Sequence, residues 1–215
     1  MALFTRPAAP TRLRSWRSAK TALSRVFQFQ CAYCENSEYS GGSYRSFQVD
    51  HFRPKSKAEF RILEHAWENL YYACPDCNSL KKDFWPSEGQ TEIGYTLIDP
   101  CREDPFVHVG VDQDGVPRAL NSHGRCIIEV FGFDIRPELQ RRWVWRDRLI
   151  REIAEVEDAL AKAQQRPAAS AVIDAKLLAQ RLNKLAGMYK LCFLGWDTRP
   201  TGKRLWPGRP QSTTR

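Results

Sequence analysis

The sequence lacks several features that would place it in other classes of protein. No apolar run approaches the roughly 18 residues that a membrane-spanning helix needs, so no membrane span is expected. The 12 glycines and 13 prolines are not periodic, which excludes a collagen-like or low-complexity chain. There is no internal repeat and no glycine-rich phosphate loop, so we do not expect the chain itself to hydrolyse ATP. No apolar signal segment opens the sequence, and we expect a cytoplasmic protein.

What is present supports a folded core. Hydrophobic residues make up 42% and aromatic residues 12% of the 215 positions. This apolar content excludes wholesale disorder and corresponds to one medium domain, or to a small domain with an extension. The sequence gives no indication of oligomeric state.

The chain is basic, with a formal net charge of +8, and the excess lies at its two ends. Residues 1–30 contain six Lys or Arg and no acid, and residues 151–215 contain twelve basic and six acidic residues. The middle is slightly acidic. This pattern predicts a polyanionic partner held by the ends, with divalent metal bound in the middle. The acid-free N-terminus also resembles an organellar transit peptide, but we favour a basic arm followed by a short helix at about 15–28.

The seven cysteines include two pairs with the same spacing. Cys31 and Cys34 form one Cys-x-x-Cys knuckle, and Cys74 and Cys77 form the second. Two redox pairs or four buried thiols are the alternatives, but two turn-like pairs together favour a structural zinc ion bound by four thiolates. The 39 residues between the knuckles are too many for a simple zinc ribbon, so the insert is where chemistry is expected.

The insert has the pattern of two strands followed by a helix. Residues 45–51 alternate aromatic and β-branched side chains with polar ones, and residues 69–73 could form a second strand. A helix is expected from Pro75, in its first turn, to the stop at Pro86.

Together these motifs resemble the HNH endonuclease family. The resemblance rests on Asp50-His51 after a strand, on Asn69, and on Cys-x-x-Cys-Asn-x-x-Lys at 74–81, within two zinc knuckles. It spans residues 31–82 and has Asn78 where a third histidine often stands. It implies an α+β fold with a ββα-metal core clamped by a structural zinc.

The resemblance also implies roles for these residues in DNA hydrolysis. His51 would be the general base, because a neutral imidazole accepts a proton near pH 7. Asp50 and Asn78 would hold one catalytic Mg²⁺ or Mn²⁺ through oxygen. Asn69 would fix the loop and the orientation of the histidine. The basic side chains around this centre are expected to contact backbone phosphates: Arg53, Lys55, Lys57, Lys81 and Lys82.

The remainder of the chain is predicted to be an extension of this core. We expect a hairpin at 106–116, a short helix to about 130, and a helical pair at 137–165 and 170–188. The arginine-rich start of the long helix is a second candidate DNA contact. The resulting division is a basic arm and helix (1–30), a nuclease core (31–90), a hairpin and helical extension (91–197) and a basic tail (198–215).

The wider pattern is similar to one branch of the HNH family. Cys-Ala-Tyr-Cys-Glu at 31–35, His-Phe-Arg-Pro-Lys-Ser at 51–56 and Trp-x-Asn-Leu at 67–70 resemble nucleases that act beside an ATPase in Septu-type and retron-type antiphage defence. This resemblance implies DNA as substrate and an ATPase as partner. A stand-alone restriction-type enzyme and a non-catalytic zinc-stabilised nucleic-acid-binding module are the alternatives.

Overall fold

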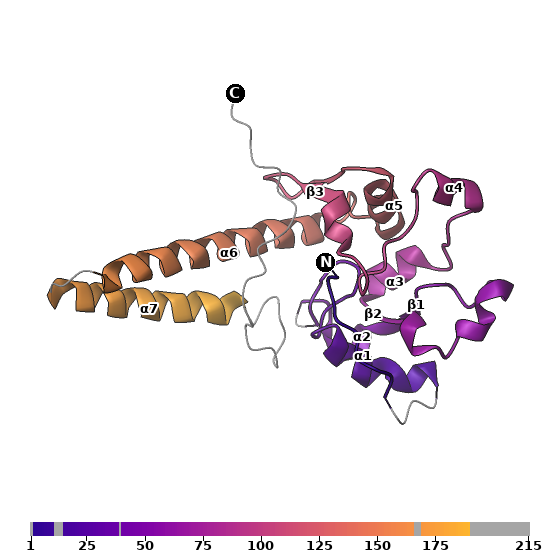
Figure 1. The fold of residues 1–215 in the computed structure, drawn as a ribbon, viewed down its shortest axis with the longest axis horizontal. Helices are drawn as coiled ribbons and strands as arrows, with labels where there is room; N and C mark the ends of the chain where they lie inside the picture. The colour runs from indigo at the N-terminus through magenta and orange to yellow at the C-terminus, as the bar shows by residue number, and fades with distance from the viewer. Residues whose placement is uncertain (1, 11–14, 39, 166–168, 190–215) are drawn as a thin grey trace.

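A computed structural model describes residues 2–10, 15–38, 40–165 and 169–189 of the chain (Figure 1). The expected basic tail at 198–215 lies outside these residues. Within them, mixed helices and two small antiparallel sheets form the α+β fold expected from the sequence. None of the described helices combines the length and apolar character needed to span a membrane.

The centre of the fold is a two-stranded hairpin followed by a helix. Strands β1 (Gln48–His51) and β2 (Leu70–Ala73) are antiparallel, with Asp50 opposite Tyr71. Helix α3 (Pro75–Lys81) follows directly, with Cys74 as its N-cap. All four residues of β2 are buried, which makes this hairpin the middle of the main hydrophobic core.

Between the strands the chain forms two short 3-10 helices, η2 (Ala58–Leu63) and η3 (Trp67–Asn69). The side chain of Asn69 closes this connection: it accepts a hydrogen bond from the Arg53 N–H at 2.8 Å and donates to the Arg53 and Leu63 carbonyls at 3.0 and 3.3 Å. The loop therefore has a defined shape next to the end of β1.

The N-terminal region packs on the hairpin. The 3-10 helix η1 (Trp16–Ala19) leads into α1 (Lys20–Val26), and α1 contacts β2. Residues 2–10 are not a free arm: Phe4 is fully buried and its N–H donates to the Pro100 carbonyl at 3.0 Å. Apolar side chains in this stretch explain the difference, because they offset the cost of ordering it.

The C-terminal extension adds a second sheet and three longer helices, preceded by α4 (Glu88–Glu92). A 3-10 helix, η4 (Pro105–His108), leads into strands β3 (Val109–Val111) and β4 (Pro117–Ala119), and α5 (Ser122–Phe131) follows. Helices α6 (Pro137–Gln164) and α7 (Ala169–Tyr189) lie side by side and extend away from the core (Figure 1). Leu149, Val156 and Leu185 form a separate small core between them.

Three sequence expectations about element boundaries are wrong. Residues 43–46 form a helical turn, α2 (Ser43–Ser46), so the first strand begins only at Gln48. Helix α3 stops at Lys81 because Lys82 has a positive φ of 48°, five residues before the expected stop. Residues 105–108 are a 3-10 helix, because Pro105 begins it and Asp104 caps it, so the second hairpin starts at Val109.

Candidate active site and zinc cluster

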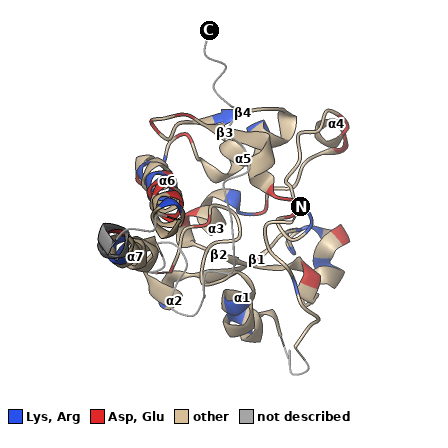
Figure 2. Cartoon of the chain, turned by 60° about the vertical axis from the view of Figure 1, so that its left-hand side comes forward, with Lys and Arg blue, Asp and Glu red and all other residues tan. Residues whose placement is uncertain are grey.

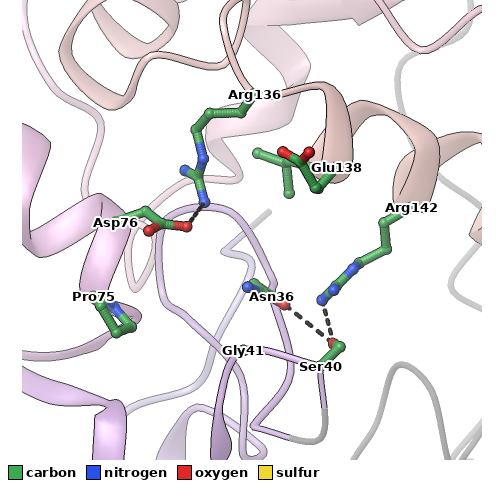
Figure 3. A pocket seen from close by; sticks show the side chains of 9 residues that line it. Asn36, Ser40, Gly41, Pro75, Asp76, Arg136, Glu138 and Arg142 are labelled. Carbon is green, nitrogen blue, oxygen red and sulfur yellow. Dashed lines mark hydrogen bonds and ion pairs between the residues drawn. The ribbon is translucent and has the colours of Figure 1, made fainter.

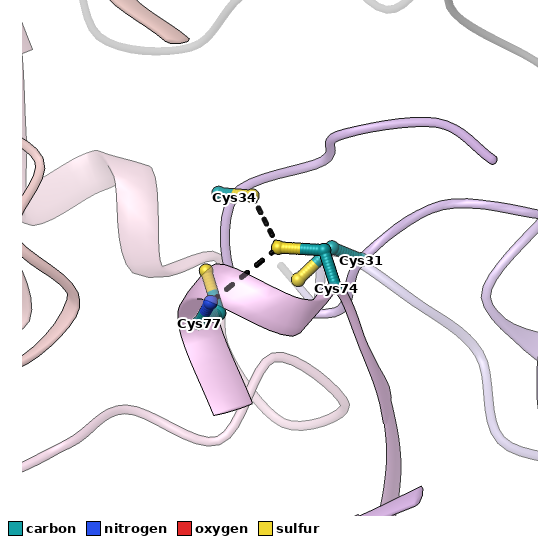
Figure 4. A group of neighbouring side chains, drawn as sticks. All are labelled: Cys31, Cys34, Cys74 and Cys77. Atoms are coloured by element: carbon teal, nitrogen blue, oxygen red, sulfur yellow. Dashed lines mark hydrogen bonds between the residues drawn. The ribbon is translucent and has the colours of Figure 1, made fainter. Parts of the chain in front are cut away.

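The two cysteine knuckles converge on one point (Figure 4). The four thiol sulfurs of Cys31, Cys34, Cys74 and Cys77 all lie within 4.8 Å of one another, and each cysteine is fully buried. The Cys34 and Cys74 sulfurs are 3.7 Å apart. Because Zn–S bonds of about 2.3 Å at tetrahedral angles place sulfurs about 3.8 Å apart, this cluster fits a zinc ion.

The chemistry of the cluster also fits a dication. Burial raises the pKa of the Cys31 and Cys77 thiols, so these groups ionise only when a cation compensates their charge. Arg136 approaches from the start of α6: its Nη1 lies 3.3 Å from the Cys77 sulfur and its Nη2 lies 2.9 Å from Asp76. A guanidinium there offsets part of the negative charge of a tetrathiolate site.

Asp50 lies in the middle of β1, on the side that faces α3. Its carboxylate is 5% exposed and is contacted by Lys81 Nζ at 3.2 Å from Oδ1 and 3.0 Å from Oδ2. The phenol of Tyr33, from the first knuckle, donates to Oδ2. Burial raises the Asp50 pKa, and the Lys81 charge and the Tyr33 hydrogen bond oppose that rise. Asp50 is therefore held in a buried ion pair.

His51 ends β1 and points to the other side of the hairpin. Its Nε2 lies 2.9 Å from the backbone carbonyl oxygen of Glu64. A carbonyl can only accept, so Nε2 carries the proton and Nδ1 keeps its lone pair. Within the described chain, Nδ1 has no hydrogen-bond partner. Burial lowers the pKa of His51, with the nearby Lys55 charge adding to this, so the imidazole is neutral near pH 7.

Asn78 occupies the exposed end of the same contact between β1 and α3. Its amide Nδ2 donates to the side chain of Gln48. Gln48 and Asp50 share one face of β1, while Asn78 and Lys81 share one face of α3. Two side-chain pairs, the two rungs of this contact, therefore join β1 to α3: Gln48 with Asn78 and Asp50 with Lys81.

Asp50 and Asn78, one in each of these two contacts, have the kind of oxygen ligand that Mg²⁺ prefers. A carboxylate and an amide oxygen on facing elements, with room for water, match its preference for a few protein oxygens. Asp50, however, is bound by the Lys81 ammonium. A metal ion at Asp50 would share these oxygens with the Lys81 ammonium, so the two cations would compete for the carboxylate.

The basic residues expected to touch nucleic acid fall into two groups. Arg53, Lys57 and Lys82 reach the surface, and the Arg53 guanidinium lies over the rings of Phe60 and Trp85. Lys81 is 1% exposed and bound to Asp50, so its ammonium does not reach the surface in this structure. Lys55 is half-buried and donates to Glu64 at 2.8 Å.

The arginines at the start of α6 face the zinc cluster as well as the solvent. Besides Arg136, Arg142 donates to Ser40, and Arg146 forms an ion pair with Glu35 at 2.5 Å. Arg136 and Arg142 line one side of a pocket of about 270 Å³ between the first knuckle and α6 (Figure 3). Lys and Arg residues alternate with Asp and Glu residues along α6 (Figure 2). These arginines attach α6 to the core, and the pocket does not include Asp50, His51 or Asn78.

Sequence reasoning missed three residues that contact the candidate centre. Tyr33 binds Asp50, Glu64 binds His51 through its carbonyl, and Trp16 packs on the His51 ring. Tyr33 lies between the two cysteines of the first knuckle, and the Cys-x-x-Cys spacing indicates no role for the residues between them. The other two lie outside the motif, and no spacing rule connects them to it.

Comparison with known proteins supports the arrangement of knuckles, hairpin and helix. No curated protein and no solved structure matches the chain significantly. The family model described as HNH endonuclease matches residues 31–84, from the first knuckle to just beyond α3. The knuckles, β1, β2 and α3 therefore form an HNH endonuclease domain, and its family supports a metal-dependent nuclease as the general activity.

Proposed function

We propose that this protein is a DNA endonuclease in which His51 activates the attacking water. The observation that carries the proposal is the hydrogen bond from His51 Nε2–H to the Glu64 carbonyl. It fixes the tautomer and leaves the Nδ1 lone pair as the proton acceptor. The lowered pKa of His51 supports the same role, because a protonated imidazole cannot accept a proton.

In the proposed reaction the nucleophile is a water molecule at Nδ1. His51 takes one proton from this water as the oxygen attacks the phosphorus. The bond from phosphorus to the leaving 3′-oxygen breaks, and that oxygen takes a proton from solvent water. By the family resemblance the products carry 5′-phosphate and 3′-hydroxyl ends. The ring is held at Nε2 throughout, so the proton transfer needs no reorientation of the imidazole.

Asp50 and Asn78 would hold the catalytic Mg²⁺ or Mn²⁺. When bound, this ion supplies positive charge where the phosphate becomes more anionic. The supporting observation is that their elements, β1 and α3, contact each other at this position. Lys81 would leave the Asp50 carboxylate when the ion binds.

Other residues of the domain would position the reactants. Asn69 would hold the loop that presents the Glu64 carbonyl, since it bonds the neighbouring Leu63 carbonyl. Arg53, Lys57 and Lys82 would bind backbone phosphates, which gives affinity and sensitivity to salt but no base preference.

The biological setting is proposed on the sequence resemblance alone. We propose that the protein is the nuclease effector of a prokaryotic antiphage defence complex, acts in the cytoplasm and works with an ATPase partner. The expected result is that an ATPase is encoded beside its gene and that co-expression of this ATPase raises the cleavage of DNA. Equal cleavage with and without that ATPase contradicts the partnership and favours a stand-alone restriction-type enzyme.

The central test is nicking of supercoiled plasmid with and without added Mg²⁺ or Mn²⁺. His51→Ala should abolish cleavage while the zinc content and the circular dichroism spectrum stay unchanged. His65→Ala is the matched control, since His65 is exposed and lies in the connection between β1 and β2. Salt-sensitive DNA binding without cleavage under any divalent metal would instead support a non-catalytic binding module. Cleavage of purified DNA at one fixed sequence, without a partner protein, would support a restriction-type enzyme.

A further inference from the structure

Trp16 lies against the candidate base although it is 15 residues before the HNH domain in the sequence. Its ring meets the His51 ring edge to face, with centroids 5.4 Å apart and an interplanar angle of 73°. Edge-to-face ring pairs have a preferred geometry, so this contact restrains the rotation of the imidazole. The HNH family match begins only at residue 31 and does not include Trp16.

Trp16 also contacts Glu64, the residue whose carbonyl accepts the hydrogen bond from His51. Its indole Nε1–H donates to Glu64 Oε1 at 3.1 Å, while the Glu64 carbonyl accepts from His51 Nε2 at 2.9 Å. One residue therefore contacts the ring of His51 and the side chain of the residue that orients it. Two independent contacts converge on the same imidazole.

Two cations hold the indole in this position. Lys55 Nζ and the Arg17 guanidinium carbon each lie 4.4 Å from the centroid of the Trp16 ring. Lys55 also donates to the same Glu64 oxygen, at 2.8 Å. These cation–π contacts and the ion pair link Trp16, Lys55 and Glu64 into one cluster beside His51.

The backbone that carries Trp16 is anchored in the core. Trp16 begins η1, and Ala19 at the end of η1 and Leu23 in α1 are both fully buried. The position of the indole is therefore set by the packing of α1 on the hairpin, and not by a loop that samples many conformations.

We infer that Trp16 is a positioning residue for the general base: it holds the His51 ring and the Glu64 residue in the geometry that proton transfer requires. This inference rests on the proposed function of His51. It assigns a part of the active site to the N-terminal segment, outside residues 31–84 that match the HNH family model.

The experiment compares plasmid nicking by the full chain with that by Trp16→Ala, Trp16→Phe and Trp145→Ala. Trp145 is the matched control, since it is 42% exposed and lies on α6. In Trp16→Ala we expect kcat to fall by about 10- to 100-fold with KM unchanged, because loss of orientation affects the chemical step. Trp16→Phe keeps a ring but loses the indole N–H, and should recover part of the rate. Trp145→Ala should cleave as the unaltered chain does.

Unchanged kcat in Trp16→Ala, or a loss carried by KM alone, overturns the inference; the second result would make Trp16 a DNA contact. If Trp16→Ala loses zinc or its fold, Trp16→Phe decides, because its ring fills most of the same space: a kcat equal to that of the unaltered chain then counts against the inference.

A second measurement does not depend on cleavage. In the unaltered chain the His51 Nε2–H proton should exchange slowly with water, as seen by NMR of ¹⁵N-histidine-labelled protein. In Trp16→Ala its exchange should be at least about tenfold faster, since the ring is free to leave the carbonyl. Equal exchange rates overturn the positioning role. Failure of the proposed nuclease activity is distinct from both results: it appears as no cleavage by the unaltered chain, or as cleavage retained in His51→Ala.

Discussion

His51 donates its Nε2 proton to the backbone carbonyl of Glu64, 13 residues further along the chain, at 2.9 Å. Because the acceptor is a backbone atom, a substitution of the Glu64 side chain does not remove it. The geometry of the loop between β1 and β2 therefore decides the tautomer of the imidazole. If His51 is the general base, as proposed, its orientation depends on the structure of this loop.

The first prediction concerns pH. Burial lowers the pKa of His51 below its usual value of about 6.5. A base works only when unprotonated, so activity is lost as pH falls through the folded-state pKa, and a lowered pKa moves that loss to more acidic pH. We expect the acid limb of kcat/KM for plasmid nicking to have its midpoint below pH 6.5.

The control for this pH profile is a measurement of whether the protein stays folded. Zinc content and circular dichroism, measured at each pH, should be constant across the limb. A midpoint at or above pH 6.5, with the fold intact, contradicts the assignment of the limb to a buried, neutral His51.

The HNH domain and the four-cysteine cluster could be predicted from the sequence because short spacings determine them. A spacing of two residues between cysteines brings both thiols of a knuckle to one point. Cys74 and Cys77 lie at the start of α3, and Pro75 in the sequence indicates that a helix begins there. The Asp50–Lys81 pair could not be predicted in the same way. It depends on how α3 packs against β1. The sequence around a lysine next to this motif does not show whether the lysine is buried or exposed.

The boundaries that failed share a physical cause. Residues 45–47 continue the alternation that suits a strand, but β2 offers partners only to residues 48–51. A strand without a partner leaves its backbone groups unpaired, so Ser43–Ser46 form a local helical turn instead. Tertiary pairing, which the sequence pattern does not contain, decides such segments.

The second prediction concerns Asn69, which is 5% exposed and makes three hydrogen bonds to the loop backbone. Asn69→Ala leaves those buried groups unpaired, so we expect a loss of about 1–3 kcal/mol in the free energy of unfolding. We also expect kcat to fall, because the loop carries the Glu64 carbonyl. Urea denaturation and plasmid nicking measure the two effects.

Asn69→Asp is the informative comparison. It keeps the oxygen that accepts from Arg53 N–H but loses both donated bonds, so it should also be less stable and slower than the unaltered chain. Full stability and full kcat in both variants would show that the loop does not need this side chain.

The third prediction concerns the thiol cluster. Cys77→Ser replaces a thiolate by a hydroxyl that is not a ligand of comparable strength, so bound zinc should be lost and the HNH domain should unfold. Zinc is measured with a colorimetric chelator and folding by circular dichroism. Cys101→Ser is the control, since Cys101 lies outside the cluster, and it should keep its zinc. Zinc retained at one equivalent in Cys77→Ser would show that the ion is not bound at these four cysteines.

The fourth prediction concerns DNA affinity. Arg53 and Lys82 are exposed at opposite ends of the segment between β1 and the end of α3. Each alanine variant should weaken DNA binding about equally for all sequences, and the slope of log K against log salt should decrease by about 1. Fluorescence anisotropy at several salt concentrations measures both. An unchanged slope in either variant removes that residue from the interface.

The last prediction concerns Lys81, whose ammonium contacts both oxygens of the Asp50 carboxylate. Lys81→Met removes this charge while keeping a long side chain, and leaves a buried carboxylate without its partner. We expect the variant to be less stable by about 3 kcal/mol when no divalent metal is added, as measured by urea denaturation. If Asp50 is a metal ligand, Mn²⁺ should bind this variant more tightly and restore more stability than it gives the unaltered chain.

Lys82→Met is the matched control, because it makes the same substitution one residue later at an exposed position. It should change neither stability nor the response to Mn²⁺. Zinc content must remain constant throughout, so metal is varied by addition and not with a chelator. If Mn²⁺ stabilises Lys81→Met no more than the unaltered chain, Lys81 and the metal do not compete for Asp50. The carboxylate would then be a structural partner of the lysine, and the catalytic ion would have to bind elsewhere in the domain.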